Sequence, residues 1–227
     1  AQGESAAPRI AEVFRLLWTQ RSFRHISFGC ALAAMGGYAG VTWMPAFLMR
    51  SFEMQPGAIG TALALIIGFF GGAGTYAAGY LGDRFGKRDL RWNVWIVAIL
   101  MAVAFPFSIS LYLAGNEVLA LVVFVYPAFA GAAYIAPALA MTQALVTVRM
   151  RAAASAVLLF ILNLIGMGLG PQLAGLFSDL YGPSMGAESL RYALLTMSVV
   201  WIWAAVHFFL AARTLREDIE RARQHGA

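Results

Sequence analysis

The sequence is poor in charged residues. Asp, Glu, Lys and Arg make up 12% of its 227 residues, whereas 61% are hydrophobic. A soluble domain typically carries about 25% charged and about 45–50% apolar residues, so this chain has too little polar surface to cover a water-soluble globule. The composition excludes a soluble globular enzyme, a disordered chain and a nucleic-acid-binding domain, and it indicates an integral membrane protein.

Motifs that carry chemistry are also scarce. Cys30 is the single cysteine, so an internal disulfide is impossible. The chain lacks an H-E-x-x-H metal motif and paired acidic residues within its apolar stretches, and neither His25 nor His207 has a G-x-S-x nucleophile as a partner. A channel's filter sequence or charged ring is missing as well. We therefore expect neither an enzyme nor a channel, with no metal ion and no cofactor.

Six long stretches contain no charged residue, and their lengths run from 21 to 31 residues. A helix crosses a bilayer with about 20 apolar residues, and the stretches lack the alternating polarity of membrane β-strands. We predict an all-α membrane protein with six transmembrane helices. The uncharged stretches, with His counted as neutral, are 25–49, 54–82, 92–116, 118–148, 152–178 and 192–212.

Basic residues are distributed unequally between the two ends of these helices. Fourteen of the 16 lie at the end that holds the N-terminus, and only Arg50 and Arg191 lie at the other. Because positively charged loops stay in the cytoplasm, we expect both termini to be cytoplasmic. The ratio of 15 arginines to one lysine favours a bacterial source, and hence a multi-pass protein of the bacterial inner membrane.

The chain divides into three predicted parts. Residues 1–21 form a cytoplasmic linker, 22–212 the six-helix bundle, and 213–227 a charged cytoplasmic tail that continues the last helix. Apolar residues in the linker recur at helical spacing, which indicates an amphipathic helix on the membrane surface; a plain linker is the alternative. These apolar residues are Ile10, Val13, Phe14, Leu17 and Trp18.

Two segments of the sequence form an internal repeat. Residues 72–86 (GAGTYAAGYLGDRFG) and 168–182 (GLGPQLAGLFSDLYG) align without a gap, 96 residues apart. The first ends the second helix and the other ends the fifth, and these helices cross the membrane in opposite directions. A 3+3 inverted repeat is typical of secondary transporters. The identical pairs are Gly72/Gly168, Gly74/Gly170, Ala78/Ala174, Gly79/Gly175, Asp83/Asp179 and Gly86/Gly182.

The loop between the second and third helices carries the motif GYLGDRFGKR, residues 79–88. Gly79 and Gly82 permit close helix packing, and Gly86 permits a sharp turn. Asp83 is suited to bind an arginine or the N-terminus of a facing helix. The basic residues of the motif, which can pair with carboxylates and lipid phosphates, are Arg84, Lys87 and Arg88. We interpret the motif as a conformational latch; the alternative is that its basic residues only set the topology.

These ten residues resemble motif A of the major facilitator superfamily, G-x-x-x-D-R-x-G-[RK]-[RK]. Members of the superfamily have two six-helix halves, so the resemblance implies one half of that fold. The basic segment before the first helix is similar to the linker that precedes the second half. This implies the C-terminal half, with an N-terminal six-helix half as its partner. The segments 43–48, 168–172 and 189–194 are similar to the Spinster-like branch, which implies lysolipid export, including sphingosine phosphate, with proton coupling.

The resemblance also implies that the first and fourth helices face a central cavity, with the second and fifth at its sides. Candidate substrate-binding residues on these helices are Tyr38, Thr42, Tyr126, Tyr134, Met141 and Asn163. Each has a structural alternative, a hydrogen bond between helices. The spans contain no Asp, Glu, Lys or Arg, and such residues usually mark proton pathways. We therefore expect the N-terminal half to handle a coupling proton.

The leading hypothesis is the C-terminal half of an alternating-access transporter. Its expected partners are the N-terminal half, membrane lipids and a small amphipathic, lysolipid-like substrate. One alternative is a major facilitator transporter of another small organic solute or drug. A second, from a different class, is a membrane lipid-binding or receptor protein without transport.

Overall fold

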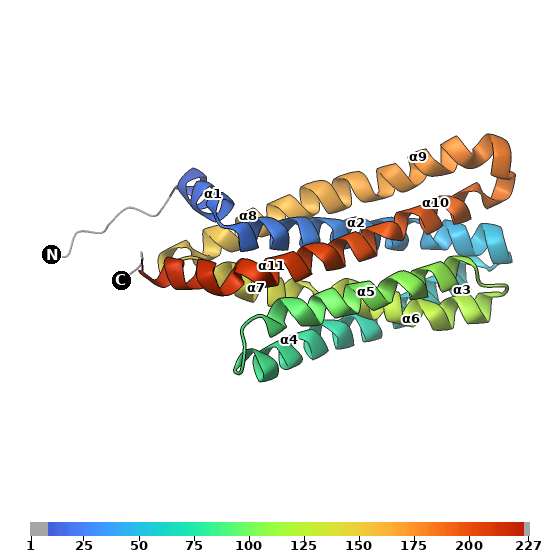
Figure 1. Cartoon of the computed structure of the whole chain (residues 1–227). Coiled ribbons are helices and arrows are strands. Elements are labelled where there is room, and N and C mark those ends of the chain that lie inside the picture. The colour runs from blue at the N-terminus through green and yellow to red at the C-terminus, as the bar shows by residue number, and fades with distance from the viewer. Residues whose placement is uncertain (1–8, 225–227) are drawn as a thin grey trace.

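The computed structural model describes residues 9–224 and is helical with short turns over this range. Six antiparallel membrane spans lie along a common axis (Figure 1), which confirms the predicted fold class. In the first three spans, span 1 is α2 (Arg21–Phe52), span 2 consists of α3 (Pro56–Leu65), η1 (Ile66–Gly71) and α4 (Gly72–Gly86), and span 3 is α5 (Trp92–Tyr112). Span 4 consists of α6 (Glu117–Ala133) and α7 (Ile135–Ala144), and span 5 of η2 (Val148–Met150), α8 (Arg151–Leu162), η3 (Asn163–Met167) and α9 (Gly168–Met185). Span 6 consists of η4 (Gly186–Glu188), α10 (Ser189–Met197) and α11 (Val199–Gln224).

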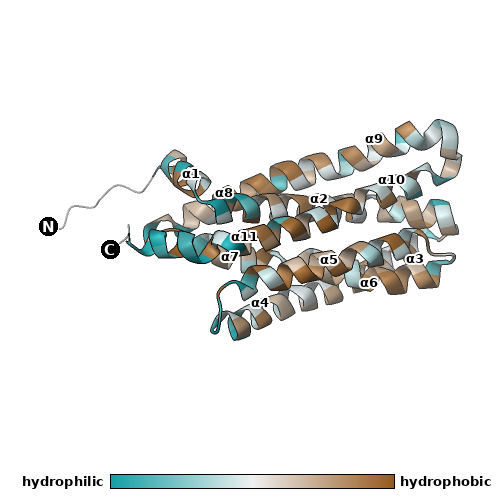
Figure 2. Ribbon diagram, in the orientation of Figure 1, coloured by the Kyte–Doolittle hydropathy of each residue, from teal (hydrophilic) through white to brown (hydrophobic). Residues whose placement is uncertain are grey.

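Within the described residues, five continuous helical segments are long and apolar enough to cross a membrane. The fifth, Val148–Gln224, has 77 residues and therefore holds both span 5 and span 6. The chain reverses between them at Gly186, whose φ of 55° is a conformation that glycine adopts readily. Hydrophilic residues gather at the two ends of the bundle, and hydrophobic residues lie between them (Figure 2).

The two sequence repeats share a backbone irregularity. A short π-helix, η1, directly precedes α4 in span 2, and a second π-helix, η3, directly precedes α9 in span 5. The helices that follow begin at Gly72 and Gly168, which are an aligned pair of the repeat. π-Helical turns within α-helices are rare and often lie at functional sites. The two repeats therefore correspond in local backbone structure as well as in sequence.

Glycines let the repeats pack in equivalent ways. A Cβ atom on Gly74 would overlap the backbone of Phe129 in α6, and one on Gly170 would overlap the backbone of Met35 in α2. Span 2 thus lies against span 4 as span 5 lies against span 1. An inverted repeat of three helices requires this relationship, because the repeat makes span 1 equivalent to span 4 and span 2 equivalent to span 5.

A separate helix, α1 (Ile10–Thr19), lies at the same end of the bundle as the C-terminal end of α11 (Figure 1). Val13 and Leu17 are fully buried, whereas Ile10, Phe14 and Trp18 are 66%, 43% and 38% exposed. A helix therefore occupies the predicted linker, but its apolar stripe is divided between the bundle and an open surface. Contact with a membrane stays a prediction.

Beyond the predicted end of the bundle, α11 continues without a break to Gln224. The first part of the predicted tail is thus helical. Residues 1–8 of the predicted linker and 225–227 of the tail lie outside the described residues.

Candidate functional site

A cavity of about 320 Å³ lies within the bundle, between spans 1, 2, 3, 4 and 6. Its walls include five glycines; the Cβ position of Gly37 has no other atom within 4 Å, whereas a Cβ atom on Gly36 would lie 2.8 Å from the side chain of Val200. Its polar and aromatic lining residues are Tyr38, Thr75, Ser108, Tyr112, Phe124, Tyr134 and Trp201, and its glycines are Gly36, Gly37, Gly40, Gly71 and Gly131. The lining includes no Asp, Glu, Lys, Arg or His, so the cavity suits an uncharged or weakly polar group.

The cavity opens toward the surface between spans 1 and 4. Val41 and Ile135 line it from these two spans and are 47% and 37% exposed. The opening therefore lies on the two helices that were expected to face a central cavity.

Tyr38 connects this cavity to span 5. Its Oη atom donates a hydrogen bond to Oδ1 of Asn163 at 3.1 Å. Nδ2 of Asn163 in turn donates to the carbonyl of Leu159 at 2.8 Å. Asn163 is the first residue of the π-helix η3, so this hydrogen bond joins the wall of the cavity to the irregular turn of span 5.

The predicted binding residues are only partly brought together. Tyr38 and Tyr134 line the cavity, and Tyr134 lies at the break between α6 and α7. Asn163 reaches the cavity only through Tyr38. Met141 is buried outside the lining, and Thr42 is exposed on span 1.

Tyr126 faces span 3 rather than the cavity. Its hydroxyl donates to the carbonyl of Leu100 at 3.4 Å, and its ring stacks on Phe107 with the centroids 4.6 Å apart. This is the structural alternative, a hydrogen bond between helices. A substrate-binding role for all six residues stays a prediction.

The sequence interpretation missed several lining residues. Ser108 and Tyr112 come from span 3, and Trp201 from span 6. Spans 3 and 6 were not among the helices expected to face or flank the cavity, so there was no reason from the sequence to choose their residues. No spacing pattern singles them out, because they face the cavity only after the six helices are packed.

The motif between spans 2 and 3 depends on glycines for its packing. A Cβ atom on Gly82 would lie 2.6 Å from Oδ1 of Asn93, and one on Gly86 would lie 2.7 Å from its Nδ2 atom. Asn93, at the start of α5, is 7% exposed. Gly79 is less tightly packed, because its Cβ atom would lie 4.0 Å from the Cβ atom of Ala136. Gly82 and Gly86 therefore let span 3 approach span 2.

The charged residues of the motif lie on the surface of the protein. Asp83, Arg84, Lys87 and Arg88 are all exposed. Nη1 of Arg84 donates to the hydroxyl of Tyr80 at 3.1 Å. Within residues 9–224, Asp83 has no hydrogen bond or ion pair, so its exposed carboxylate is not engaged by this part of the chain.

The acidic residue that forms ion pairs in this loop is Asp89, which the sequence interpretation passed over. Its carboxylate lies 2.8 Å from Nη2 of Arg91 and 2.9 Å from Nη2 of Arg216 in α11. Hydrogen bonds from the Arg91 side chain lower the pKa of Asp89 from its ordinary value of 3.8 to about 2. Asp89 thus ties the loop to span 6. Its position just after the motif was visible in the sequence, but its partner, 127 residues away, was not.

At the opposite end of the bundle, Arg191 joins three spans. Its Nη1 atom donates to the carbonyls of Tyr112 and Ala114 at 3.0 and 3.4 Å, and its guanidinium pairs with Glu188. It also lies over the rings of Phe47 and Phe52 in span 1, 5.5 and 5.6 Å from their centroids. The carbonyl of Tyr112 is one of those left free where α5 ends, so Arg191 caps that helix from span 6.

Comparison with known proteins gives consistent matches. A family model described as the Major Facilitator Superfamily matches residues 26–226. An MFS-type efflux pump from Mycolicibacterium smegmatis is 34% identical over 228 residues, covering 98% of this chain and 53% of the pump.

Solved structures show the same fold. The crystal structure of a bacterial homologue of the human lysosomal transporter Spinster, inward-facing and unoccupied, has a TM-score of 0.85 at 25% identity and covers 96% of this chain and 53% of that one. Its occupied inward-facing form has a TM-score of 0.79 at 25% identity, with 88% and 50% covered. The chain thus spans about half the length of the relatives that it matches.

Proposed function

Since the chain belongs to the major facilitator superfamily, we propose that it acts as the C-terminal half of a secondary active transporter that works by alternating access. The observation that carries this proposal is the match to 53% of an inward-facing transporter with a TM-score of 0.85. In such proteins a substrate binds near the middle of the membrane, between two units that rock about it.

The exposed face of span 2 supports the proposal that another helix, from outside this chain, packs against it. Gly57, Gly60, Gly68 and Gly72 have no atom of another side chain or helix within 4 Å of the position of a Cβ atom. Stripes of small residues in membrane helices let a second helix approach closely. We therefore assign this face to contact with the N-terminal half.

The motif at the end of span 2 supports a latch between the halves. Asp83 is exposed and lacks a partner in residues 9–224, while Asp89 already holds the loop to α11. The loop is therefore fixed to its own half and presents a free carboxylate to the other. A helix N-terminus or an arginine of that half would bind it.

The two π-helices are suited to act as paired hinges. They lie at matching positions of the repeat, in the spans that flank spans 1 and 4. Ile67 of η1 lines the cavity, and Asn163 of η3 bonds to Tyr38 at its wall. A substrate in the cavity would therefore contact or approach both irregular turns.

The substrate that the cavity supports best is amphipathic and lysolipid-like. The walls combine tyrosine, tryptophan and hydroxyl groups with apolar residues, and the lining carries no charge. Because the lining has no charged residue that could carry a coupling proton, we assign that role to the N-terminal half. A small organic solute or drug is the second candidate, favoured by the 34% identity to an MFS-type efflux pump. We place both termini in the cytoplasm of a bacterium, from the excess of arginine at that end.

Proteoliposomes provide the test. The chain reconstituted with the upstream half should transport a lysolipid in a saturable manner, and a drug substrate should compete poorly. Saturable transport by residues 1–227 alone would contradict the half-transporter proposal. Equilibrium binding without translocation would instead favour a lipid-binding or receptor protein.

A further inference from the structure

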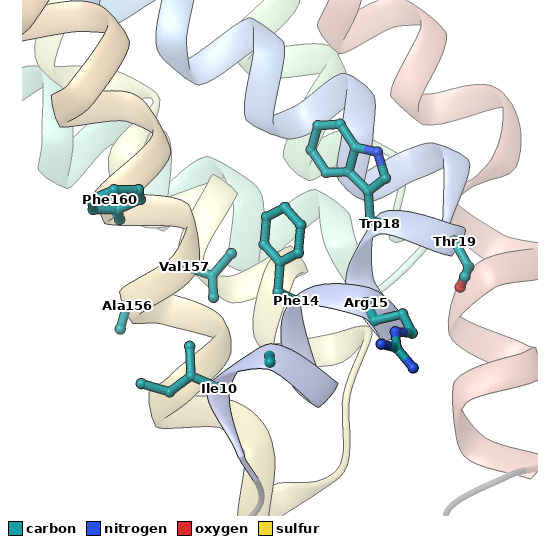
Figure 3. Close-up of a pocket in the computed structure, with 9 residues that line it drawn as sticks. Ile10, Phe14, Arg15, Trp18, Thr19, Ala156, Val157 and Phe160 are labelled. Atoms are coloured by element: carbon teal, nitrogen blue, oxygen red, sulfur yellow. The ribbon is translucent and has the colours of Figure 1, made fainter.

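A second and larger hollow lies outside the bundle, between α1 and α8. It has a volume of about 1020 Å³. Its apolar walls come from Ile10, Phe14 and Trp18 of α1 and from Ala156, Val157 and Phe160 of α8, and Arg15 and Thr19 supply its polar edge. Figure 3 shows Ile10 and Phe14 close to Val157, with Trp18 and Phe160 farther along the direction in which α8 runs.

Exposed aromatic rings continue from this groove around the end of the bundle. Phe14 stacks on Trp18 with centroids 5.5 Å apart, and Trp18 meets the edge of Phe28 at 6.0 Å. Phe28 lies 5.6 Å from His207, which lies 6.4 Å from Trp203. Tryptophan rings such as those of Trp18 and Trp203 concentrate where membrane lipids meet water. The band therefore places the groove at the level of the lipid headgroups.

The segments that contain α1 and α8, together with the residues that flank them, are strongly positive, although only Arg15 and Arg151 lie within the two helices themselves. Residues 9–24 and 148–162 contain six arginines and one acidic residue, Glu12. Within residues 9–224, Arg15 has no acidic partner. In Figure 3, Arg15 lies below Phe14 and Trp18, on the side away from Phe160. A molecule that follows the groove would thus meet apolar rings at one end and a free guanidinium at the other.

We propose that this groove binds an anionic phospholipid, with one acyl chain between α1 and α8 and its phosphate at Arg15. The apolar walls remove the chain from water, and a guanidinium pairs with phosphate oxygens through directed hydrogen bonds. The lipid would attach α1 to span 5 from outside, opposite the face where Val13 and Leu17 bury against the bundle. The site is separate from the cavity between spans 1 and 4, and it does not depend on which substrate is transported.

Quenching of tryptophan fluorescence by brominated lipids tests the proposal. The intact transporter is placed in phosphatidylcholine vesicles that contain a minor fraction of brominated phosphatidylglycerol or, in parallel, of brominated phosphatidylcholine. The difference between the wild type and Trp18→Phe isolates the emission of Trp18. We expect brominated phosphatidylglycerol to quench Trp18 at about fivefold lower content, since one basic residue near an anionic lipid contributes roughly that factor.

Variants of the groove distinguish the contribution of the lipid headgroup to binding from that of the acyl chain. Arg15→Gln should remove the preference for phosphatidylglycerol, whereas Arg50→Gln, at the opposite end of the bundle, should retain it. Ala156→Phe fills the groove and should reduce quenching by both lipids. Equal quenching by the two lipids in the wild type, or an unchanged preference in Arg15→Gln, would overturn the proposal. No quenching by either lipid would overturn it too, because a protein segment would then cover the groove.

Discussion

Asp218 in α11 caps the first turn of α2, although 196 residues separate it from its partner Ser22. Its Oδ2 atom accepts hydrogen bonds from the backbone nitrogen of Ser22 at 2.8 Å and from Oγ at 2.7 Å. The carboxylate is 1% exposed and also lies 3.2 Å from Nη1 of Arg221. The first four N–H groups of a helix lack partners within it, and negative charge there is favourable. The last helix of the bundle therefore stabilises the start of the first.

Asp218→Ala should destabilise the bundle. Loss of a buried hydrogen-bond acceptor that carries charge costs about 1.5–3 kcal/mol, so the thermal unfolding temperature in detergent should fall clearly. Glu217→Ala is the control, because Glu217 is 67% exposed and pairs with Arg221 only at the surface. Equal unfolding temperatures for the two variants would show that the cap does not stabilise the bundle.

Asp83→Asn should change transport without unfolding the protein. The carboxylate has no partner in residues 9–224, so its removal costs this half no contact. Loss of a charge at a helix N-terminus of the other half is worth about 0.3–1 kcal/mol, which corresponds to a shift of up to about fivefold between inward- and outward-facing forms. Cysteine accessibility in membranes measures the shift. Arg84→Ala should act in the same direction, and wild-type accessibility and kinetics in both would refute the latch.

Asp89→Asn should instead weaken the loop's attachment to α11, in a pH-dependent way. The pKa of Asp89 is lowered to about 2 in the folded protein, from 3.8. The carboxylate's contribution to stability is therefore fully present above about pH 4 and disappears as pH falls toward 2. The difference in stability between wild type and Asp89→Asn should be constant from pH 5 upward and shrink below pH 4. A difference that grows on acidification would contradict the ion pairs with Arg91 and Arg216.

Glycine substitutions should affect the two repeats in parallel. Gly74→Ala and Gly170→Ala place a Cβ atom against the backbone of a neighbouring span, and overpacking of this kind costs about 1–3 kcal/mol. Gly72→Ala and Gly168→Ala, each two residues away, meet no other atom and should be neutral or stabilising by up to about 1 kcal/mol. Detergent-solubilised yield and melting temperature of residues 1–227 report the result. A strong effect in one repeat only would argue against equivalent packing.

Tyr38→Phe and Tyr126→Phe should differ in substrate affinity. Both remove a hydroxyl that donates one hydrogen bond, but only Tyr38 lines the cavity. A neutral hydrogen bond contributes about 1 kcal/mol, so Tyr38→Phe should raise the KM for a lysolipid about fivefold while Tyr126→Phe leaves it unchanged. Equal effects of the two substitutions would place the substrate outside this cavity.

The sequence predicted the membrane helices well because their signal is local. The apolar length of each uncharged stretch by itself indicates a membrane helix, and each of the six structural spans overlaps one of these stretches. The boundaries were less accurate. Span 1 begins at Arg21, four residues before its uncharged stretch, because charged side chains at a helix end can reach water without ending the helix.

The candidate site was less predictable because it depends on rotations of whole helices. Tyr38 and Tyr126 both lie at helical spacing with other polar residues, yet one faces the cavity and the other faces span 3. Trp201 was not considered, but it lines the cavity from span 6. In a membrane helix both the lipid-facing and the protein-facing sides are apolar, so hydropathy alone does not distinguish them.

The sequence by itself determined the all-helical membrane class, the inverted repeat and the glycine-rich motif, because each of these features depends on residues that are adjacent or regularly spaced along the chain. Only the tertiary structure decided that Asp89, rather than Asp83, pairs with Arg216 and that Asp218 caps α2. These contacts join residues more than 100 positions apart. No periodicity links such positions along the chain, and only the packing of span 6 against spans 1 and 3 brings them within hydrogen-bonding distance.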